Sequence, residues 1–132
     1  MTSSPVQERA VRMIRRLSRV AFYVGLLLVV ALSLIPQDAM PTPDLWDKAS
    51  HGLAYAALAV AGGIGYRSSR ALIRIALGLF LLGAALELAQ SALPDRIASL
   101  YDVLANATGI VVGSLFVSGA NRVRPKHRPS GG

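Results

Sequence analysis

The sequence predicts an all-α protein, an antiparallel bundle of four transmembrane helices with both termini in the cytoplasm. Of its 132 residues, 53% are hydrophobic and only 16% are charged, whereas a typical soluble domain has about 25% charged residues. The apolar residues gather in four long runs separated by short loops, and such runs suit helices that cross a bilayer. Lys and Arg are concentrated at the two chain ends and in one short turn, which places these three segments in the cytoplasm by the positive-inside rule.

The chain begins with a basic segment, residues 1–19, that contains five arginines and the single acidic residue Glu8. Apolar residues interleaved with the arginines are typical of a basic amphipathic helix on the membrane surface; a solvated cytoplasmic tail is the alternative. Residues 20–35 are the first predicted membrane helix, which is uncharged and is closed by Pro36. A basic start before an apolar run also resembles a signal peptide, but no clear small-x-small cleavage site follows, so we expect an uncleaved helix.

A short polar loop with Pro41 and Pro43 leads to the second predicted helix, residues 45–66. Asp44 is the expected N-cap of this helix, because aspartate is favoured at that position and proline precedes it. Trp46 is the only tryptophan of the chain and lies where an aromatic anchor at the membrane interface is expected.

The third and fourth predicted helices are residues 71–93 and 100–120. A tight basic turn precedes the third helix, and Pro94 ends it. Ser99 begins a capping-box pattern, with an acidic residue three positions later, and is the expected N-cap of the fourth helix. Residues 121–132 combine basic residues with Pro and Gly, and we expect a disordered cytoplasmic tail.

Within the predicted membrane domain, polar residues lie mainly near the helix ends that this topology places outside the cell. There the second and fourth helices begin and the third ends, so these residues should lie at one depth. A charged side chain at that depth is costly unless it is paired or close to water, which predicts a charge-paired polar site at the extracytoplasmic rim. The candidate ligand-binding residues are Asp47, Lys48, His51, Tyr55, Glu87, Gln90, Arg96, Asp102 and Asn106.

The spacing in the fourth helix predicts which face points into the bundle. At about 100° per residue, Asp102, Asn106, Gly109 and Gly113 lie within roughly 60° of one face. Gly109 and Gly113 form a small-xxx-small pattern, which is typical of close packing between membrane helices. We therefore expect the two glycines to pack against a neighbouring helix, and Asp102 and Asn106 to point into the bundle rather than at lipid.

A structural role explains some of these polar residues without any ligand. Asp47 and Asp102 lie in first helical turns, where the cap and the helix dipole favour an acid by about 0.3–1 kcal/mol. Glu87 lies near the end of a helix, which disfavours an anion, so it needs a counter-charge from Lys48, Arg96 or a protonated histidine. A balanced network of this kind can also serve only to specify the fold.

Three motifs together resemble the VanZ-like family of bacterial membrane proteins. They are Asp-Lys-x-x-His-x-x-x-Tyr, Glu-x-x-Gln before an outer loop with Arg, and Asp-x-x-x-Asn-x-x-Gly-x-x-x-Gly, and they fall within residues 44–117. The resemblance implies a small multi-pass protein of the bacterial cell membrane. The family includes members linked to resistance to glycopeptide antibiotics, teicoplanin in particular. It implies no established catalytic mechanism, so only positions are carried over. The matching positions are Asp47, Lys48, His51, Tyr55, Glu87, Gln90, Arg96, Asp102, Asn106, Gly109 and Gly113.

Several functions are open from the sequence. The first is binding of a lipid head group or a cell-envelope precursor at the outer rim, with an effect on glycopeptide sensitivity as one consequence. The second is a structural or partner-binding membrane protein whose polar network only fixes the bundle. The third is an intramembrane hydrolase acting on a lipid-linked substrate, with His51 and Asp47 as general base and Glu87 or Asp102 as acid.

Other partners are not expected, and no catalytic residue is assigned. His51, Glu87 and Asp102 would be an acceptable set of metal ligands, but a lone histidine argues against a metal site, and we expect no cofactor. The formal net charge of +7 does not indicate nucleic-acid binding, because aromatic residues are only 6% and do not interleave with the basic runs. The composition implies the lipid bilayer as a partner, and the oligomeric state is left open.

Overall fold

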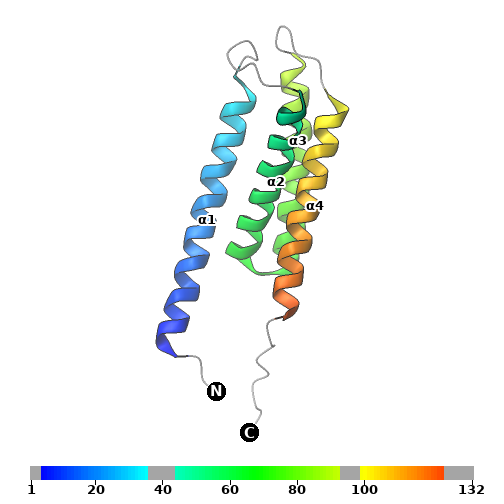
Figure 1. The fold of residues 1–132 in the computed structure, drawn as a ribbon. Coiled ribbons are helices and arrows are strands. Elements are labelled where there is room, and N and C mark those ends of the chain that lie inside the picture. Colours follow the sequence, from blue (N-terminus) through cyan, green and yellow to red (C-terminus); the bar gives the residue numbers. More distant parts are fainter. Residues whose placement is uncertain (1–3, 36–43, 93–98, 124–132) are drawn as a thin grey trace.

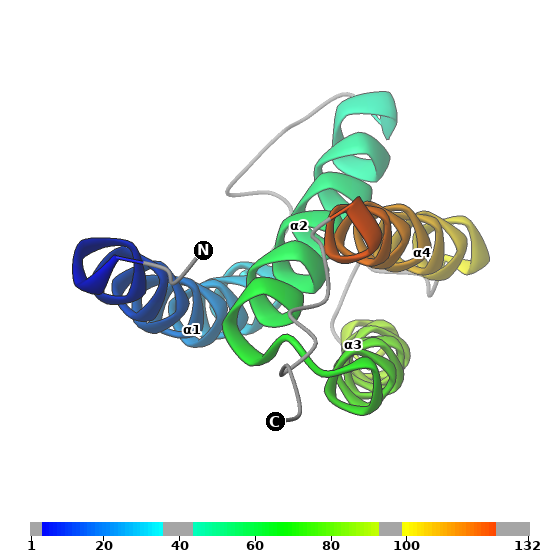
Figure 2. The same cartoon turned by 90° about the horizontal axis from the view of Figure 1, so that it is seen from below.

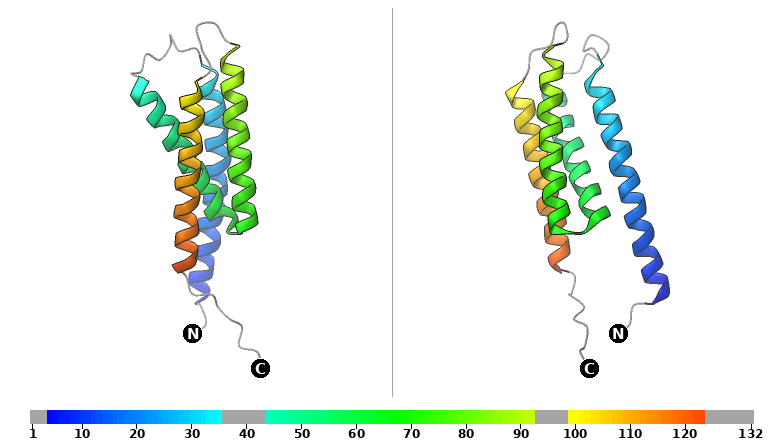
Figure 3. Two further views of the ribbon diagram at one scale, coloured as in Figure 1. Left: turned by 90° about the vertical axis from the view of Figure 1, so that its right-hand side faces the viewer. Right: turned by 180° about the vertical axis from the view of Figure 1, so that it is seen from behind.

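The structure is a computed structural model that describes residues 4–35, 44–92 and 99–123, and of residues 44–48 only the course of the helix. The described chain forms four helices, and successive helices run in opposite directions, as Figures 1 and 3 show. The prediction of an all-helical fold is confirmed. The helices are α1 Pro5–Ser33, α2 Asp44–Tyr66, α3 Ser69–Gln90 and α4 Leu100–Val123.

The predicted start of the first helix was wrong. We expected a boundary between residues 19 and 20, but α1 runs without a break from Pro5. Ser4 is its N-cap: the Ser4 hydroxyl accepts from the Gln7 backbone N–H, and the Gln7 side chain accepts from the Ser4 N–H, both at 3.3 Å. This is a capping box followed by a proline in the first turn, which is favourable there. The change from basic to apolar residues does not break the helix, because arginine is a good helix former.

The other predicted bounds differ by a few residues. The second helix begins at Asp44 rather than 45, and α4 ends at Val123 rather than 120. The third begins two residues early, because the Ser68 hydroxyl caps it by accepting from the Ala71 N–H at 3.5 Å. It ends at Gln90 rather than 93. The predicted loop residues Pro36, Pro41, Pro43 and Pro94, the tail beyond residue 123 and the Trp46 side chain lie outside the described residues.

The second helix is the centre of the bundle. It contacts each of the other three helices, and its contact with α4 is the most extensive in the protein. Figure 2 shows α2 between α1 and α4 and inclined to both. Because α2 and α4 are alternate helices of an up-and-down bundle, they run parallel to each other.

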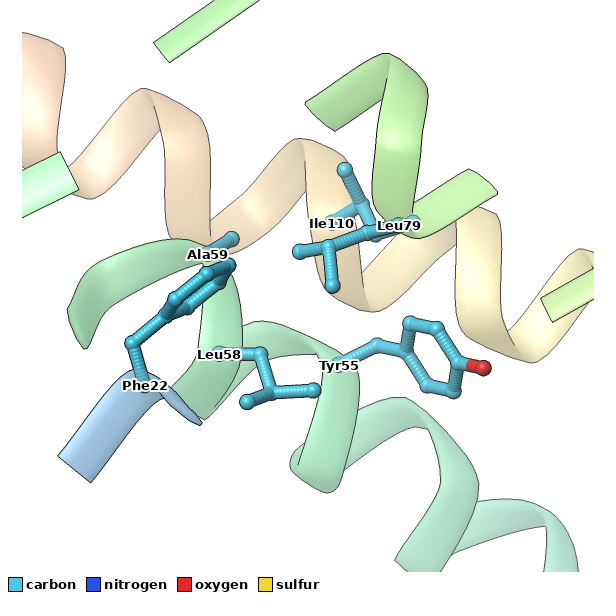
Figure 4. Close-up of a cluster of buried hydrophobic side chains, with 6 residues drawn as sticks. All are labelled: Phe22, Tyr55, Leu58, Ala59, Leu79 and Ile110. Carbon is cyan, nitrogen blue, oxygen red and sulfur yellow. The ribbon is translucent and has the colours of Figure 1, made fainter. Parts of the chain in front are cut away.

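An apolar cluster joins the four helices in the middle of the bundle, as Figure 4 shows. The α2 residues of this cluster are almost fully enclosed, since Tyr55 is 1% exposed and Ala59 is fully buried. This packing fixes the rotation of α2 and therefore the direction of the polar residues one turn earlier. The cluster consists of Phe22, Tyr55, Leu58, Ala59, Leu79 and Ile110.

The outer surface of the bundle is that of a membrane protein. Within the described residues, α1, α3 and α4 are long and apolar enough to cross a membrane by length and composition, and α2 is not among them. Large apolar side chains are exposed along the outer faces, for example Leu27, Leu88 and Leu115, which are 72%, 73% and 66% exposed. A soluble monomer rarely exposes apolar surface on this scale. Because α2 lies between other helices, most of its described side chains are at least partly buried and it presents little surface to lipid.

Candidate functional site

Six candidate residues that the structure describes lie between the middle of the bundle and the end where α1 and α3 end and α2 and α4 begin (upper half in Figure 1). Each of three helices contributes one pair of them. The side chains of Asp47 and Lys48, and all of Arg96, lie outside the described residues. The six are His51 and Tyr55 on α2, Glu87 and Gln90 on α3, and Asp102 and Asn106 on α4.

The α2 and α4 pairs are held together by small residues. A Cβ atom on Gly52 would lie 3.4 Å from the Ala105 carbonyl oxygen, and one on Gly109 would overlap the Gly52 carbonyl oxygen. One turn further, a Cβ on Gly113 would lie 3.0 Å from the Ala59 Cβ. The two backbones therefore meet directly beside the polar residues, which explains why glycine stands at positions 109 and 113.

Tyr55 and Asn106 meet α3 at Gly83. A Cβ on Gly83 would lie 3.2 Å from both the Tyr55 hydroxyl oxygen and the Asn106 Nδ2. Figure 4 shows the phenol with its oxygen directed away from the apolar cluster, and Tyr55 also interacts electrostatically with Glu87. A Cβ at position 83 would crowd both side chains, so glycine lets the phenol and the amide approach the surface of α3 closely.

The Glu87 carboxylate reaches the start of α4. It is only 5% exposed, and its Oε2 accepts a hydrogen bond from the Ser99 backbone N–H at 3.2 Å. Ser99 is the N-cap of α4, as predicted, since its hydroxyl accepts from the Asp102 N–H at 3.3 Å. An anion at a helix N-terminus is favoured by the helix dipole, so α4 stabilises the charge that the end of α3 disfavours.

The role of Glu87 as a partner of α4 was missed from the sequence. The capping-box pattern assigned the acid at position 102 to the Ser99 N–H, but a carboxylate from another helix accepts from that group. The signal was the short connection between Glu87 and the serine cap, which brings the end of one helix to the start of the next.

Gln90 connects the cluster to α1. Its Nε2 donates to the Ser33 carbonyl oxygen at 2.8 Å, in the last turn of α1, and the side chain is 5% exposed. The sequence contained no signal for this contact, because a backbone carbonyl acceptor is present at every residue. Gln90 is thus an interhelical tie between α3 and α1.

Asp102 and Asn106 each keep a buried acceptor that has no hydrogen-bond partner among the described residues. The two atoms are Asp102 Oδ1 and Asn106 Oδ1, one turn apart on the same face of α4. Asn106 is 3% exposed. Buried polar atoms without a partner are rare in folded proteins, and each costs about 1–3 kcal/mol. Among the described residues, Glu87 and Gln90 therefore have hydrogen-bond partners, whereas one oxygen each of Asp102 and Asn106 does not.

His51 is half-buried on α2, one turn before Tyr55, and has an interaction of its own. The described side chains contain no group of three His, Asp or Glu residues that could hold a metal ion. Within those side chains, His51, Glu87 and Asp102 therefore do not form the metal site considered from the sequence.

The fold and the cluster define a class: a helical membrane protein with a buried polar cluster at one end of its bundle. Comparison of the chain with protein-family models, curated proteins and solved structures finds no match. The resemblance to VanZ-like proteins accordingly stays a proposal that rests on the motifs.

Replacing Glu87 with glutamine tests the contact between α3 and α4. The substitution keeps the shape of the side chain but removes the charge, so it should destabilise the protein by about 1–2 kcal/mol. Denaturant unfolding of the purified protein in detergent micelles measures the change. The control is Glu8→Gln, which removes an exposed carboxylate from a surface ion pair and should leave the midpoint unchanged. An unchanged midpoint for Glu87→Gln would show that the charge at α4 contributes nothing.

Proposed function

We propose that this is a VanZ-like protein with four membrane spans that binds the polar head group of a lipid or cell-envelope precursor at its polar cluster. In this proposal α2 is the fourth span, enclosed by the other three. Both termini are cytoplasmic, because the basic residues lie at that end of the helices. The polar cluster then faces the outside of the bacterial cell membrane, at the depth of the lipid head groups.

The observation that carries the proposal is the pair of buried oxygens on Asp102 and Asn106 that find no hydrogen-bond partner within residues 4–35, 49–92 and 99–123. Carboxylate and amide oxygens accept hydrogen bonds, so the group that satisfies them must donate. Phosphate diester oxygens and ester carbonyls are acceptors and do not fit. An ammonium group, a sugar hydroxyl or an amide N–H fits, and the carboxylate further favours a cation.

A purely structural network explains only half of the cluster. Such a network gains stability by satisfying its own polar groups, as Glu87 and Gln90 do through Ser99 and Ser33. It does not account for two acceptors on one face of α4 that the described side chains leave unsatisfied. The hydrolase alternative needs Asp47 beside His51, and the Asp47 side chain lies outside the described residues, so binding is the function that the described polar atoms support best.

Two phospholipids that differ in donor capacity test the proposal. Phosphatidylethanolamine presents an ammonium with N–H donors, whereas phosphatidylcholine presents a cation of the same charge without any donor. We expect the purified protein to retain the ethanolamine lipid at least about fivefold better, because one hydrogen bond to a charged group contributes about 1.5–3 kcal/mol. Native mass spectrometry of the protein released from mixed-lipid nanodiscs measures the ratio of the two bound lipids.

Asp102→Asn is the matched variant for that experiment. It keeps the size of the side chain but removes its negative charge, so the preference for the ethanolamine lipid should fall to about twofold or less. Equal retention of the two lipids by the wild-type protein, or an unchanged preference in Asp102→Asn, contradicts the proposal.

A further inference from the structure

A groove lies at the opposite end of the bundle, between α1 and α4. The Cα atoms of these two helices stay more than 8 Å apart along their described lengths, and the last turns of α2 lie between them, as Figure 2 shows. The groove has a volume of about 190 Å³, and its walls are mostly apolar. The residues that define it include Val11, Ile14 and Arg15 of α1, Ile64 of α2, and Phe116 and Asn121 of α4.

Arg15 lines this groove with a charged guanidinium group, one N–H of which donates no hydrogen bond to the described residues. Its Nε is buried and has no hydrogen-bond partner in the described part of the chain. Arg19, one turn later on the same face of α1, shows how such a donor is normally satisfied. The Arg19 Nε donates to the Gly65 carbonyl oxygen at 3.0 Å, and its guanidinium lies 5.2 Å from the centre of the Tyr66 ring. The end of α2 therefore satisfies Arg19 but not Arg15.

The vacant partner of Arg15 must be an acceptor, and a negatively charged one is favoured because the guanidinium is always ionised. Neighbouring positive charges also favour an anion. Arg12 and Arg16 lie near Arg15 on α1, and Arg67, directly after α2, lines the groove. The apolar walls of the groove suit an alkyl chain. A guanidinium above an apolar groove at the end of a membrane helix has the chemistry of a phospholipid site, and basic pockets between such helices bind anionic head groups.

We propose that this groove is a second lipid site that holds an anionic phospholipid, with its phosphate at Arg15 and an acyl chain along Ile14 and Phe116. This site is independent of the polar cluster at the other end, and its chemistry is the reverse. The cluster offers unused acceptors and selects a donor, whereas the groove offers an unused donor and selects an acceptor.

The test uses phosphatidylmethanol, which has one negative charge and no hydrogen-bond donor, against phosphatidylcholine. Neither lipid supplies the donor that the polar cluster requires, so the result depends on the groove alone. Arg15→Gln and Arg16→Gln remove the same charge from neighbouring positions of α1, but Arg16 does not line the groove. We expect Arg15→Gln to lower the retention of phosphatidylmethanol about tenfold and Arg16→Gln to lower it less than twofold.

A second variant fills the groove without changing its charge. Ala120→Phe places an aromatic ring in the apolar part and should also reduce retention of phosphatidylmethanol about tenfold, with Arg15 intact. If Arg15→Gln does not fold, Ala120→Phe decides the question. Equal losses in Arg15→Gln and Arg16→Gln would indicate general surface attraction and overturn the proposal. So would full retention by Ala120→Phe, or occupation of the groove by a second copy of the chain, seen as dimers in the spectrum.

Discussion

Replacing Asn106 with leucine is expected to stabilise the protein and at the same time to abolish its preference for phosphatidylethanolamine over phosphatidylcholine. The Asn106 Oδ1 is buried without a partner among the described residues, so the folded state bears the cost of removing this oxygen from solvent and regains no hydrogen bond to it from them. A leucine of similar size removes that cost, and the expected gain is about 1–3 kcal/mol in the free energy of unfolding. The loss of binding follows because leucine cannot accept a hydrogen bond.

Ser114→Ala is the matched control for this prediction. The Ser114 Oγ is also buried on α4 without a partner, but it lies two turns beyond Asn106, towards the end of the helix that does not hold the polar cluster. Its removal should raise stability modestly and leave lipid preference unchanged. If both variants gain stability but only Asn106→Leu loses the lipid preference, Asn106 behaves as a residue of a binding site.

Two measurements on the same samples decide the outcome for Asn106. Denaturant unfolding in detergent gives the stability, and native mass spectrometry gives the ratio of bound lipids. If Asn106→Leu destabilises the protein, the amide is needed inside the bundle and the acceptor is not free for a ligand. If the lipid ratio is unchanged, Asn106 does not contact the head group.

Replacing Gly109 with alanine is expected to be the most damaging small substitution in the described chain. The added Cβ would overlap the Gly52 carbonyl oxygen and would lie 3.1 Å from the Ala56 backbone nitrogen. Both obstacles are backbone atoms, which cannot rotate away, so α2 and α4 must separate along their contact. Overpacking of a core usually costs about 1–3 kcal/mol and sometimes more, and we expect a loss of at least about 3 kcal/mol here.

The same substitution at Gly119 provides the control. Gly119 lies on the same helix, and a Cβ there would have no atom within 4 Å. Since alanine favours a helix over glycine by about 1 kcal/mol, Gly119→Ala should be neutral or slightly stabilising. The difference between the two variants in denaturant unfolding isolates the contact between α2 and α4. Equal stabilities would show that the two helices are not in backbone contact.

Separation of α2 and α4 should also abolish lipid preference at the polar cluster. Tyr55 and Asn106 are brought to Gly83 by the contact that Gly109 makes possible. The variant that disturbs packing should therefore lose stability and binding together, whereas Asn106→Leu should lose binding and gain stability. This opposite pattern distinguishes a residue that supports the site from one that contacts the head group.

Some properties of this protein followed from the sequence because they depend on local or one-dimensional information. Long apolar runs and their breaks predicted four helices, and helix capping preferences predicted Ser99 as the start of α4. Up-and-down connections then place the polar residues of three helices at one end of the bundle. The error in α1 arose because a change in charge was interpreted as a helix boundary, although the arginines there favour a helix and Ser4 with Gln7 already forms its cap.

Only the tertiary structure decided which polar groups are satisfied and which are not. Glu87 accepts a hydrogen bond from the backbone N–H of Ser99, and Gln90 donates one to the carbonyl oxygen of Ser33. One oxygen each of Asp102 and Asn106 has no hydrogen-bond partner among the described residues. Every residue but proline carries the same backbone donor and acceptor, so no pattern of side chains reveals such a pairing. A hydrogen bond also forms only when the donor–acceptor distance falls within a range of a few tenths of an ångström. Only the packing of the helices sets that distance.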